Sequence, residues 1–211
     1  LAVEQLARDG YRLLLQIHDF AEDFRPQNYR YLQRKLAAPR GAPLPDLLYP
    51  QSEAIHYAVL NGRDAQVLAE AGVSSPRLHF LPNPVSPPPV DADRSRARAA
   101  ATSVLGLPEA WQLVVYPVRG IRRKNLGEML LWSAVVEAAL FVVTMPPKNP
   151  QERTAFDRWA KLAAALDLPC RLGSPPQLPF GQALAASDAL LTTSVAEGLG
   201  MAFVEAWLAG R

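Results

Sequence analysis

The feature that most constrains this chain is an apolar run that leads through a glycine-containing turn into a helical pattern. The run covers residues 189–193, the turn contains Gly198 and Gly200, and the helical pattern begins at Met201. A short apolar run bounded in this way predicts a buried strand, and apolar residues spaced by three and seven predict a helix. A strand, a turn and a helix N-terminus in this order aim backbone N–H groups at an anion. The segment therefore predicts an anion-binding edge of an α/β sheet.

Two carboxylates flank this turn, and they are not equivalent. Glu197 lies in the loop at the carboxyl end of the expected strand, where open α/β sheets bind ligands. Glu205 lies on the expected helix, between Met201 and Leu208 and beside the apolar stripe that they begin and end. A carboxylate there is costly unless a polar group meets it, and ligand hydroxyls would serve. An ordinary amphipathic helix with a charged first turn is the alternative interpretation.

The same alternation of strand and helix runs through the rest of the chain. Further buried strands are expected at residues 11–17, 55–60, 113–118 and 139–144. Repeated alternation predicts an α/β protein with parallel, doubly wound sheets. One of the expected helices, residues 93–104, carries Arg94, Arg96 and Arg98, and we expect these arginines to be solvated.

Prolines indicate a domain boundary. The chain contains 20 prolines, and five of them fall between Leu81 and Val90. Such a segment is extended and stiff, as a connector between domains often is. We therefore expect two domains, residues 1–84 and residues 85–211.

Composition and charge exclude several classes of protein. The chain is 49% hydrophobic and 20% charged, which is typical of a globular protein, and its net charge of +2 is too small to imply nucleic acid as a partner. The single cysteine, Cys170, rules out an internal disulfide and fits a reducing compartment. No stretch reaches the roughly 18 apolar residues of a membrane span. We expect a soluble, cytoplasmic protein, and peripheral contact with a membrane stays open.

A cluster of cations follows the expected strand at residues 113–118. Within six residues the chain places Arg119, Arg122, Arg123 and Lys124. Like charges this close repel one another. A diphosphate would resolve the repulsion, because Arg grips two oxygens in its planar fork and Lys adds a point charge. A basic loop that faces solvent is the alternative, and the Gly-x4-Gly-Lys-Ser/Thr loop of P-loop NTPases is absent from the sequence.

The three histidines have different settings. His18 follows the expected strand at residues 11–17, at the edge where sites form, with Asp19 beside it; a helix or loop cap is the alternative. His56 and His79 lie within strand patterns, and we expect both to be structural. Without cysteines or carboxylates at ligand spacing, the histidines do not predict a zinc site.

Taken together, these motifs resemble the retaining glycosyltransferases of family 4. Glu197 and Glu205 match the family's Glu-x7-Glu signature, and Arg119 and Lys124 match its pair of cations after the first strand of the C-terminal domain. The Pro-Asn-Pro-Val segment at residues 82–85 is similar to the end of the family's N-terminal domain.

The family has the GT-B fold, in which two Rossmann-like doubly wound domains face a cleft. The resemblance implies an acceptor-side domain over residues 1–84 and a donor-binding domain over residues 85–211. The family's opening strand and its final helices have no counterpart here, so we expect the chain to be incomplete at both ends.

The resemblance also implies roles for individual residues. Glu197 would contact the donor sugar and Glu205 the nucleotide ribose, while Arg119 and Lys124 would clamp the donor diphosphate. Asn125 stands where the family usually has glycine, a change that is tolerable because Asn accepts a positive φ. The other donor-side candidates, for the diphosphate, sugar or nucleobase, are Arg171, Leu172, Ser194, Gly198, Leu199 and Gly200. In the other domain the candidates are His18 near the donor sugar, and Asp19 and Asn61 on the acceptor side.

These roles imply a retaining hexosyltransferase that moves a sugar from a nucleotide-diphosphate sugar to an acceptor hydroxyl on a glycan, lipid or small molecule. The catalytic set would be His18, Arg119, Lys124 and Glu197, with no cofactor and no metal ion, because the cations replace the metal. A GT-B phosphorylase, a nucleotide-sugar epimerase and a non-catalytic nucleotide-binding scaffold are the alternatives. The donor base, the donor sugar and the acceptor stay open.

Overall fold

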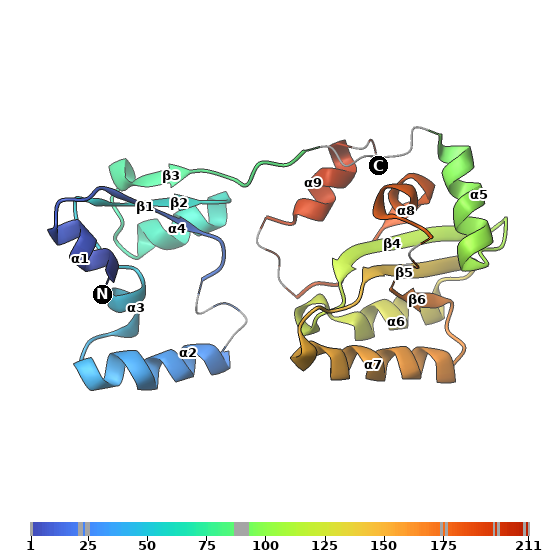
Figure 1. Ribbon diagram of the computed structural model, residues 1–211, viewed down its shortest axis with the longest axis horizontal. Helices are drawn as coiled ribbons and strands as arrows, with labels where there is room; N and C mark the ends of the chain where they lie inside the picture. The colour runs from blue at the N-terminus through green and yellow to red at the C-terminus, as the bar shows by residue number, and fades with distance from the viewer. Residues whose placement is uncertain are drawn as a thin grey trace. The chain divides into compact units, whose positions relative to one another are not determined.

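The computed structural model describes residues 2–20, 23, 26–86, 93–173, 175, 177–195, 197, 199–208 and 210. The chain divides into two compact units, a first unit of Leu1–Pro84 and a second unit of Val85–Arg211. Each unit contains its own parallel β-sheet (Figure 1).

The first unit is built on a three-stranded parallel sheet with the strand order β1-β2-β3. The strands are β1 (Leu13–Ile17), β2 (Ile55–Val59) and β3 (Leu78–Phe80). The α-helices are α1 (Ala2–Arg8), α2 (Pro26–Leu32), α3 (Leu44–Leu48) and α4 (Gly62–Glu70). Short π and 3₁₀ turns, named η, complete the unit: η1 (Gln33–Ala37), η2 (Ala38–Arg40) and η3 (Ser75–Arg77).

One face of this sheet carries the core of the first unit. Successive side chains of a strand point to opposite faces, so Leu13, Leu15 and Ile17 face the core together with Tyr57 and Val59 of β2. Apolar residues of α1 and α4 pack against the same face. The alternation of burial along β1 follows directly from this one-sided covering.

The second unit has a four-stranded parallel sheet with the order β6-β5-β4-β7. Its strands are β4 (Gln112–Arg119), β5 (Ala139–Met145), β6 (Cys170–Leu172) and β7 (Ala189–Leu190). Its helices are α5 (Arg94–Leu105), α6 (Leu126–Val135), α7 (Pro150–Ala165), α8 (Phe180–Ala186) and α9 (Met201–Leu208), and a 3₁₀ turn, η4 (Arg122–Lys124), precedes α6.

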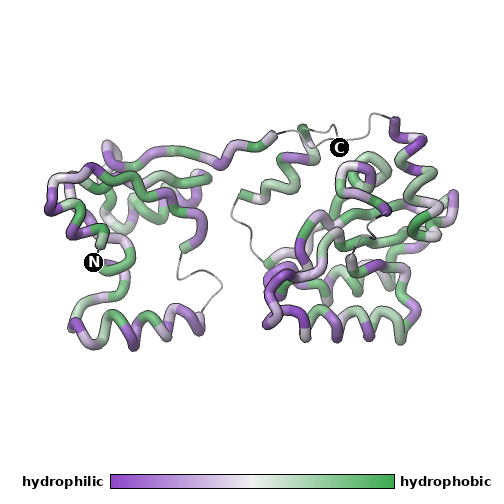
Figure 2. The backbone as a smooth tube through the Cα atoms, viewed as in Figure 1, coloured by the Kyte–Doolittle hydropathy of each residue, from purple (hydrophilic) through white to green (hydrophobic). Residues whose placement is uncertain are grey.

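Two hydrophobic cores cover the two faces of this second sheet. Leu113 and Val115 of β4 pack into one core with residues of α5 and α8. Tyr116 and its alternate neighbours pack into the other core with residues of α6 and α7. Figure 1 shows the corresponding helix layers on either side of β4 and β5. Because both faces are covered, aliphatic residues predominate in β4 and β5, and Figure 2 colours these residues green. The doubly wound parallel sheet predicted from the sequence is confirmed here.

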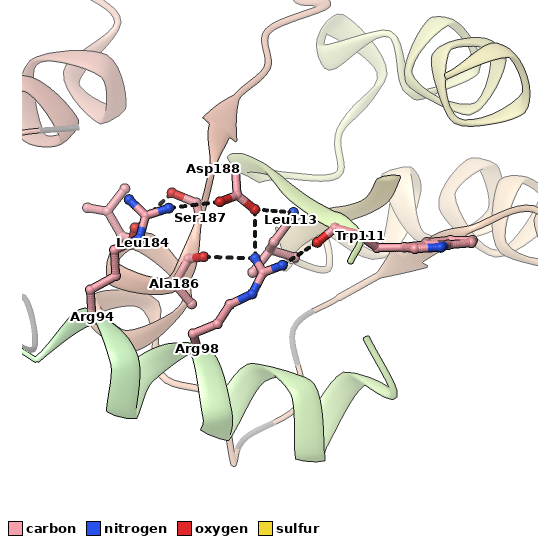
Figure 3. Close-up of polar contacts among 8 residues, drawn as sticks. All are labelled: Arg94, Arg98, Trp111, Leu113, Leu184, Ala186, Ser187 and Asp188. Carbon is pink, nitrogen blue, oxygen red and sulfur yellow. Dashed lines mark hydrogen bonds and ion pairs between the residues drawn. The ribbon is translucent and has the colours of Figure 1, made fainter. Parts of the chain in front are cut away.

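An ion-pair network ties α5 to the sheet at the edge where β4 begins (Figure 3). Asp188, just ahead of β7, accepts hydrogen bonds from Arg94 at 2.8 Å and Arg98 at 2.6 Å. Its Oδ2 also accepts the backbone N–H of Leu113 at 2.7 Å, and Arg98 donates to the carbonyl of Trp111. The expectation of solvation is therefore wrong for Arg98, whose side chain is only 24% exposed, whereas Arg94 stays exposed although it pairs with Asp188. The reason is that the partner, Asp188, lies about 90 positions away in the sequence, and the pattern of a single helix does not predict such a contact.

The same contacts set the charge state of Asp188. Burial by itself would raise its pKa, but the hydrogen bonds from Leu113 and Arg98, with the charges of Arg98 and Arg94, lower the pKa overall. The carboxylate is thus held ionised, and it joins α5, β4 and β7 at a single point.

A glycine just after β4 permits a close approach that no other residue allows. Gly120 is buried and its N–H donates to the carbonyl of Met145 at 2.8 Å. A Cβ at this position would overlap the ring of Phe156 on α7. We expect Gly120→Ala to lower the free energy of unfolding by about 2 kcal/mol, the usual cost of overpacking a core. Urea denaturation measures this. Gly62→Ala is the matched control, because a Cβ at Gly62 meets nothing within 4 Å; an equal loss in both variants would contradict the steric argument.

Candidate functional site

The sheet topology brings two loops of the second unit together. β4 and β7 are parallel neighbours, with Val115 opposite Leu190, and Leu191 continues the pairing by donating its N–H to the carbonyl of Val115 at 3.0 Å. Parallel strands end at the same edge, so the basic loop after β4 and the segment after β7 leave the sheet side by side. The N–H of Val195 donates to the carbonyl of Arg123 at 3.0 Å and joins the two loops directly.

An ion pair between a buried lysine and a half-buried glutamate lies at this junction. Lys124 is only 7% exposed, and its Nζ donates to Oε1 of Glu197. The same carboxylate oxygen lies 2.6 Å from Oγ of Ser194, which donates to it. Burying an ammonium group is costly unless it is paired and hydrogen-bonded. Lys124 meets this condition through Glu197, a residue 73 positions away in the sequence.

Two further hydroxyls extend the contact network beneath the ion pair. The Tyr116 hydroxyl lies 2.6 Å from Oγ of Ser194 and 3.0 Å from the carbonyl of Lys124. Thr193 also reaches that carbonyl at 3.0 Å. Each hydroxyl has one proton to donate. If Thr193 satisfies the carbonyl of Lys124, Tyr116 is free to donate to Ser194 and Ser194 to Glu197, so that every donor has an acceptor.

The charges around Glu197 keep it ionised. Burial by itself would raise the pKa of Glu197, but hydrogen bonds from Lys124 and Ser194, with the charges of Lys124 and Arg123, lower the pKa overall. The site therefore holds a fixed carboxylate beside a buried ammonium group.

The backbone after Lys124 turns through a left-handed residue. Asn125 has φ of 49° and ψ of 53°, a conformation that Asn adopts more readily than most residues. The prediction that Asn replaces glycine here because of its tolerance for unusual φ agrees with this geometry. Asn125 is the residue just before α6, and its side-chain amide donates to Glu128 at 2.6 Å. The turn fixes the direction in which Lys124 leaves the loop.

The other cations of the loop have different surroundings. Arg119 ends β4 and Arg122 begins η4, and both are exposed. Neither side chain makes a hydrogen bond or an ion pair with a residue that the structure describes, although the backbone N–H of Arg122 donates to Glu152 at 2.9 Å. Arg123 is half-buried, and its charge acts on Glu197. The loop thus keeps two guanidinium groups available at the sheet edge.

The start of α9 follows Glu197 closely. Leu199 is half-buried, Gly200 has φ of 67°, and α9 begins at Met201. Glu205 is half-buried on α9 and makes no hydrogen bond or ion pair with any described residue. Gly198 was predicted as part of this turn and lies outside the described residues.

The remaining donor-side candidates lie on β6. Arg171 is exposed, and its guanidinium donates to the carbonyl of Cys170 at 3.0 Å. Leu172 is partly buried and packs against the core that α6 and α7 cover. Both belong to the strand that pairs in parallel with β5, so their strand ends at the same edge as β4.

The first-unit candidates lie at the corresponding edge of the first sheet. His18 and Asp19 are exposed and directly follow β1. Asn61 follows β2 and caps α4: its side-chain oxygen accepts the N–H of Asp64 at 2.9 Å, and its amide donates to the Asp64 carboxylate at 2.9 Å. These residues belong to a different compact unit from Lys124 and Glu197.

Sequence reasoning missed the two hydroxyls beneath the ion pair, Tyr116 and Thr193. Both are buried at the end of apolar strand patterns, where they were interpreted as core residues. A single polar tip in an aliphatic strand, as in Val114-Val115-Tyr116, is the only signal that could have identified the tyrosine.

No group of three or more His, Cys, Asp or Glu side chains in the described part of the chain is placed to hold a metal ion. Within the same residues, no helix combines the length and the apolar character needed to cross a bilayer.

Known proteins resemble this chain in sequence and in fold. No family model matches the sequence. The chain is 29% identical over 206 residues to the mannosylglucosyl-3-phosphoglycerate synthase of Petrotoga mobilis, covering 91% of this chain and 38% of that protein.

Solved structures resemble the chain over its whole length. Anabaena HepE in complex with UDP-glucose matches with a TM-score of 0.71 and 16% identity, over 100% of this chain and 54% of HepE. Sucrose-phosphate synthase from Thermosynechococcus elongatus matches with a TM-score of 0.62 and 14% identity, over 97% of this chain and 50% of the synthase. The structural matches are GT-B glycosyltransferases, and the predicted GT-B fold is confirmed. The chain spans about half the length of these structures, and less of the curated relative.

Proposed function

We propose that this chain contains most of the donor site of a retaining glycosyltransferase that uses a nucleotide-diphosphate sugar. The observation that carries the proposal is the partly buried Lys124–Glu197 ion pair at the carboxyl edge of β4 and β7. An ion pair at this depth contributes little net stability compared with a hydrophobic pair, so a binding role explains it better than a structural one.

The diphosphate would lie against the basic loop. Arg119 supplies a planar fork of donors and Lys124 a point charge, and both stabilise the negative charge that develops as the nucleoside diphosphate leaves. The N-terminus of α9, after Gly198, Leu199 and Gly200, adds backbone donors and a positive dipole end. With these charges in place, the proposed transfer needs no metal ion and no cofactor.

Glu197 would hold the donor sugar and Glu205 the ribose. In the structure the Lys124 ammonium group donates to the Glu197 carboxylate. A diphosphate that takes over Lys124 would release the Glu197 carboxylate to accept hydrogen bonds from sugar hydroxyls, while Ser194 keeps its orientation. Glu205 is half-buried and makes no hydrogen bond or ion pair with a described residue, and it would accept hydrogen bonds from the ribose hydroxyls. Arg171 and the backbone at Leu172 would lie beside the nucleobase.

His18, Asp19 and Asn61 complete the proposal on the acceptor side. We propose that His18 acts near the sugar and that the acceptor hydroxyl is bound by first-unit residues. UDP-glucose is the first donor to test, because HepE, which shares the fold, was crystallised with it. A reducing, cytoplasmic location is part of the same proposal, since the chain has one cysteine.

The decisive assay is donor turnover followed by proton NMR. The protein is incubated with UDP-glucose, GDP-mannose or ADP-glucose, with and without a chelator, and the released nucleotide and the anomeric configuration of the sugar are recorded. We expect one donor to be consumed, with retention of configuration and with no loss of rate in the chelator. Inversion of the anomeric configuration, or a rate that depends on added metal, would contradict the mechanism. Binding of a donor without turnover in the presence of any acceptor would indicate a non-catalytic scaffold instead.

Tyr116 offers a finer test of the site. We expect Tyr116→Phe to weaken binding of the nucleotide sugar several-fold, because Ser194 loses the hydroxyl that orients it toward Glu197. The free energy of unfolding should fall by about 1 kcal/mol, the usual worth of a hydrogen bond. Tyr57→Phe is the matched control: its buried hydroxyl donates to the carbonyl of Pro50 at 2.8 Å in the first unit. Calorimetric titration should find donor affinity unchanged in Tyr57→Phe. An equal loss of affinity in both variants would contradict the proposal that Tyr116 positions Ser194.

A further inference from the structure

Two of the three histidines meet on the first sheet. His56 lies on β2 and His79 on β3, and Ala58 is the direct partner of His79 in the register of the two strands. The two histidines are therefore diagonal neighbours on one face, opposite the face to which Tyr57 and Val59 contribute core residues. Nδ1 of His56 lies 2.8 Å from Nε2 of His79. Sequence patterns alone gave no sign of this contact.

The two rings lie edge to edge in nearly the same plane. Their planes differ by 15° and their centroids are 5.1 Å apart. In each imidazole ring the nitrogen lies about half a ring width from the centroid. The centroid separation exceeds the nitrogen–nitrogen distance by about one ring width, which is the largest difference possible, so both nitrogens lie close to the line between the centroids. The lone pair or N–H of each nitrogen is consequently directed at the other. In the neutral pair one ring donates its proton and the other accepts it.

This geometry also suits a metal ion. We propose that His56 and His79 form a two-imidazole site for a divalent late transition-metal ion, such as Cu²⁺, Ni²⁺ or Zn²⁺. The ring that donates the hydrogen bond moves its proton to its other nitrogen, so that both facing nitrogens present a lone pair to the ion. Zn–N bonds of about 2.0–2.1 Å at a tetrahedral angle place two ligand nitrogens about 3.3 Å apart. The pair needs to open by only about 0.5 Å to reach that separation. Because the two nitrogens face each other in line, each ring must also tilt by about 35° for both lone pairs to point at the ion. Rotation of the two side chains supplies both movements.

The surroundings determine which ions the site takes. His79 is exposed and His56 half-buried, so an ion can reach the pair from solvent. No third protein ligand stands beside them in the described residues, and water completes the coordination sphere. Imidazole ligands favour Cu²⁺ over Ni²⁺ and Zn²⁺, and exclude the hard ions Mg²⁺ and Ca²⁺. A site with two ligands binds reversibly rather than as a permanent structural centre.

A metal ion here would fasten the last strand of the first unit. β3 has three residues and pairs only with β2 in the sheet order. A bond from each strand to one ion would cross-link β2 and β3 just ahead of the proline-rich segment. Binding to the folded protein would then stabilise the first unit in proportion to the concentration of the ion. This site is separate from the donor site and does not depend on the proposed function.

The test is a titration of the untagged, metal-free protein with CuCl₂, NiCl₂, ZnCl₂ and MgCl₂ by calorimetry. We expect one ion bound per chain, with Cu²⁺ tightest and no heat from Mg²⁺. His79→Ala and His56→Gln should each weaken Cu²⁺ binding at least tenfold, whereas His18→Ala, which removes the third histidine of the chain, should leave the affinity unchanged. The electron paramagnetic resonance spectrum of the Cu²⁺ complex should show coupling to two imidazole nitrogens.

Two results would overturn the proposal. One is the absence of measurable Cu²⁺, Ni²⁺ or Zn²⁺ binding by the folded wild-type protein. The other is unchanged Cu²⁺ affinity in both His79→Ala and His56→Gln, which would place the ion elsewhere. Circular dichroism of each variant before titration establishes that it is folded, and His79→Ala alters only an exposed side chain.

Discussion

Replacing Lys124 with methionine should destabilise the second unit and remove most of its affinity for a nucleoside diphosphate. Glu197 would be left as a partly buried carboxylate without its cation. Removing one member of a fully buried pair typically costs about 3 kcal/mol or more in the free energy of unfolding. Because the Glu197 side chain is 26% exposed, we expect a smaller loss of about 2 kcal/mol here. The lost ammonium group should weaken diphosphate binding about 10- to 100-fold, because a hydrogen bond to a charged group contributes about 1.5–3 kcal/mol. Urea denaturation and calorimetric titration with UDP, GDP and ADP measure the two effects.

The double variant Lys124→Met/Glu197→Gln separates stability from binding. It removes both charges, so stability should return close to that of the wild type while diphosphate affinity stays low. Glu197→Gln alone should bind the free nucleoside diphosphate more tightly, because the competing carboxylate is gone, but should lose the added affinity for the sugar conjugate. Wild-type diphosphate affinity in Lys124→Met would show that the loop cations do not form the site.

Replacing Asp188 with asparagine should produce the largest purely structural loss. The variant keeps at most one of the acceptor oxygens that bind Arg94, Arg98 and the N–H of Leu113. We expect the free energy of unfolding to fall by about 2–3 kcal/mol, a value reduced by the partial exposure of the carboxylate. Asp157→Asn is the matched control, since its pair with Arg153 is an exposed i,i+4 contact worth less than about 0.5 kcal/mol.

The same variant should change how stability depends on pH. The pKa of Asp188 is lowered in the folded protein from its ordinary value of 3.8. Its contribution is therefore fully present above about pH 4 and is lost as pH falls through the folded pKa. In Asp188→Asn the unfolding free energy should decline less steeply over this acidic range than in the wild type. Parallel curves for the two proteins would contradict the assignment of the lowered pKa to this network.

Local patterns in the sequence predicted the sheet architecture of the second unit well. Apolar runs separated by helices gave the doubly wound sheet, because a strand covered on both faces must be hydrophobic throughout. Asn125 was expected to be tolerable where the family usually has glycine, because Asn accepts a positive φ, and its φ of 49° agrees. The proximity of the basic loop to Glu197 followed from parallel pairing, since parallel strands end at one edge.

Contacts between distant residues were not predictable in the same way. Tyr116 reads as a core residue until Ser194 is placed 2.6 Å from its hydroxyl. Arg98 and Asp188 pair across 90 positions, and His56 reaches His79 only in the register that β2 and β3 adopt. Hydrophobic periodicity specifies which face a residue occupies, but not which polar side chain meets it from another element.

The measurement that tests the donor site most directly is calorimetric titration of UDP, GDP, ADP and their hexose conjugates into the wild type and the Lys124→Met/Glu197→Gln variant. We predict that one nucleotide and its sugar conjugate bind the wild type, that the conjugate binds more tightly, and that the folded double variant loses both interactions. Equal affinity in the two proteins, or no binding of any nucleotide to the wild type, would contradict the assignment of this ion pair to a nucleotide-sugar site.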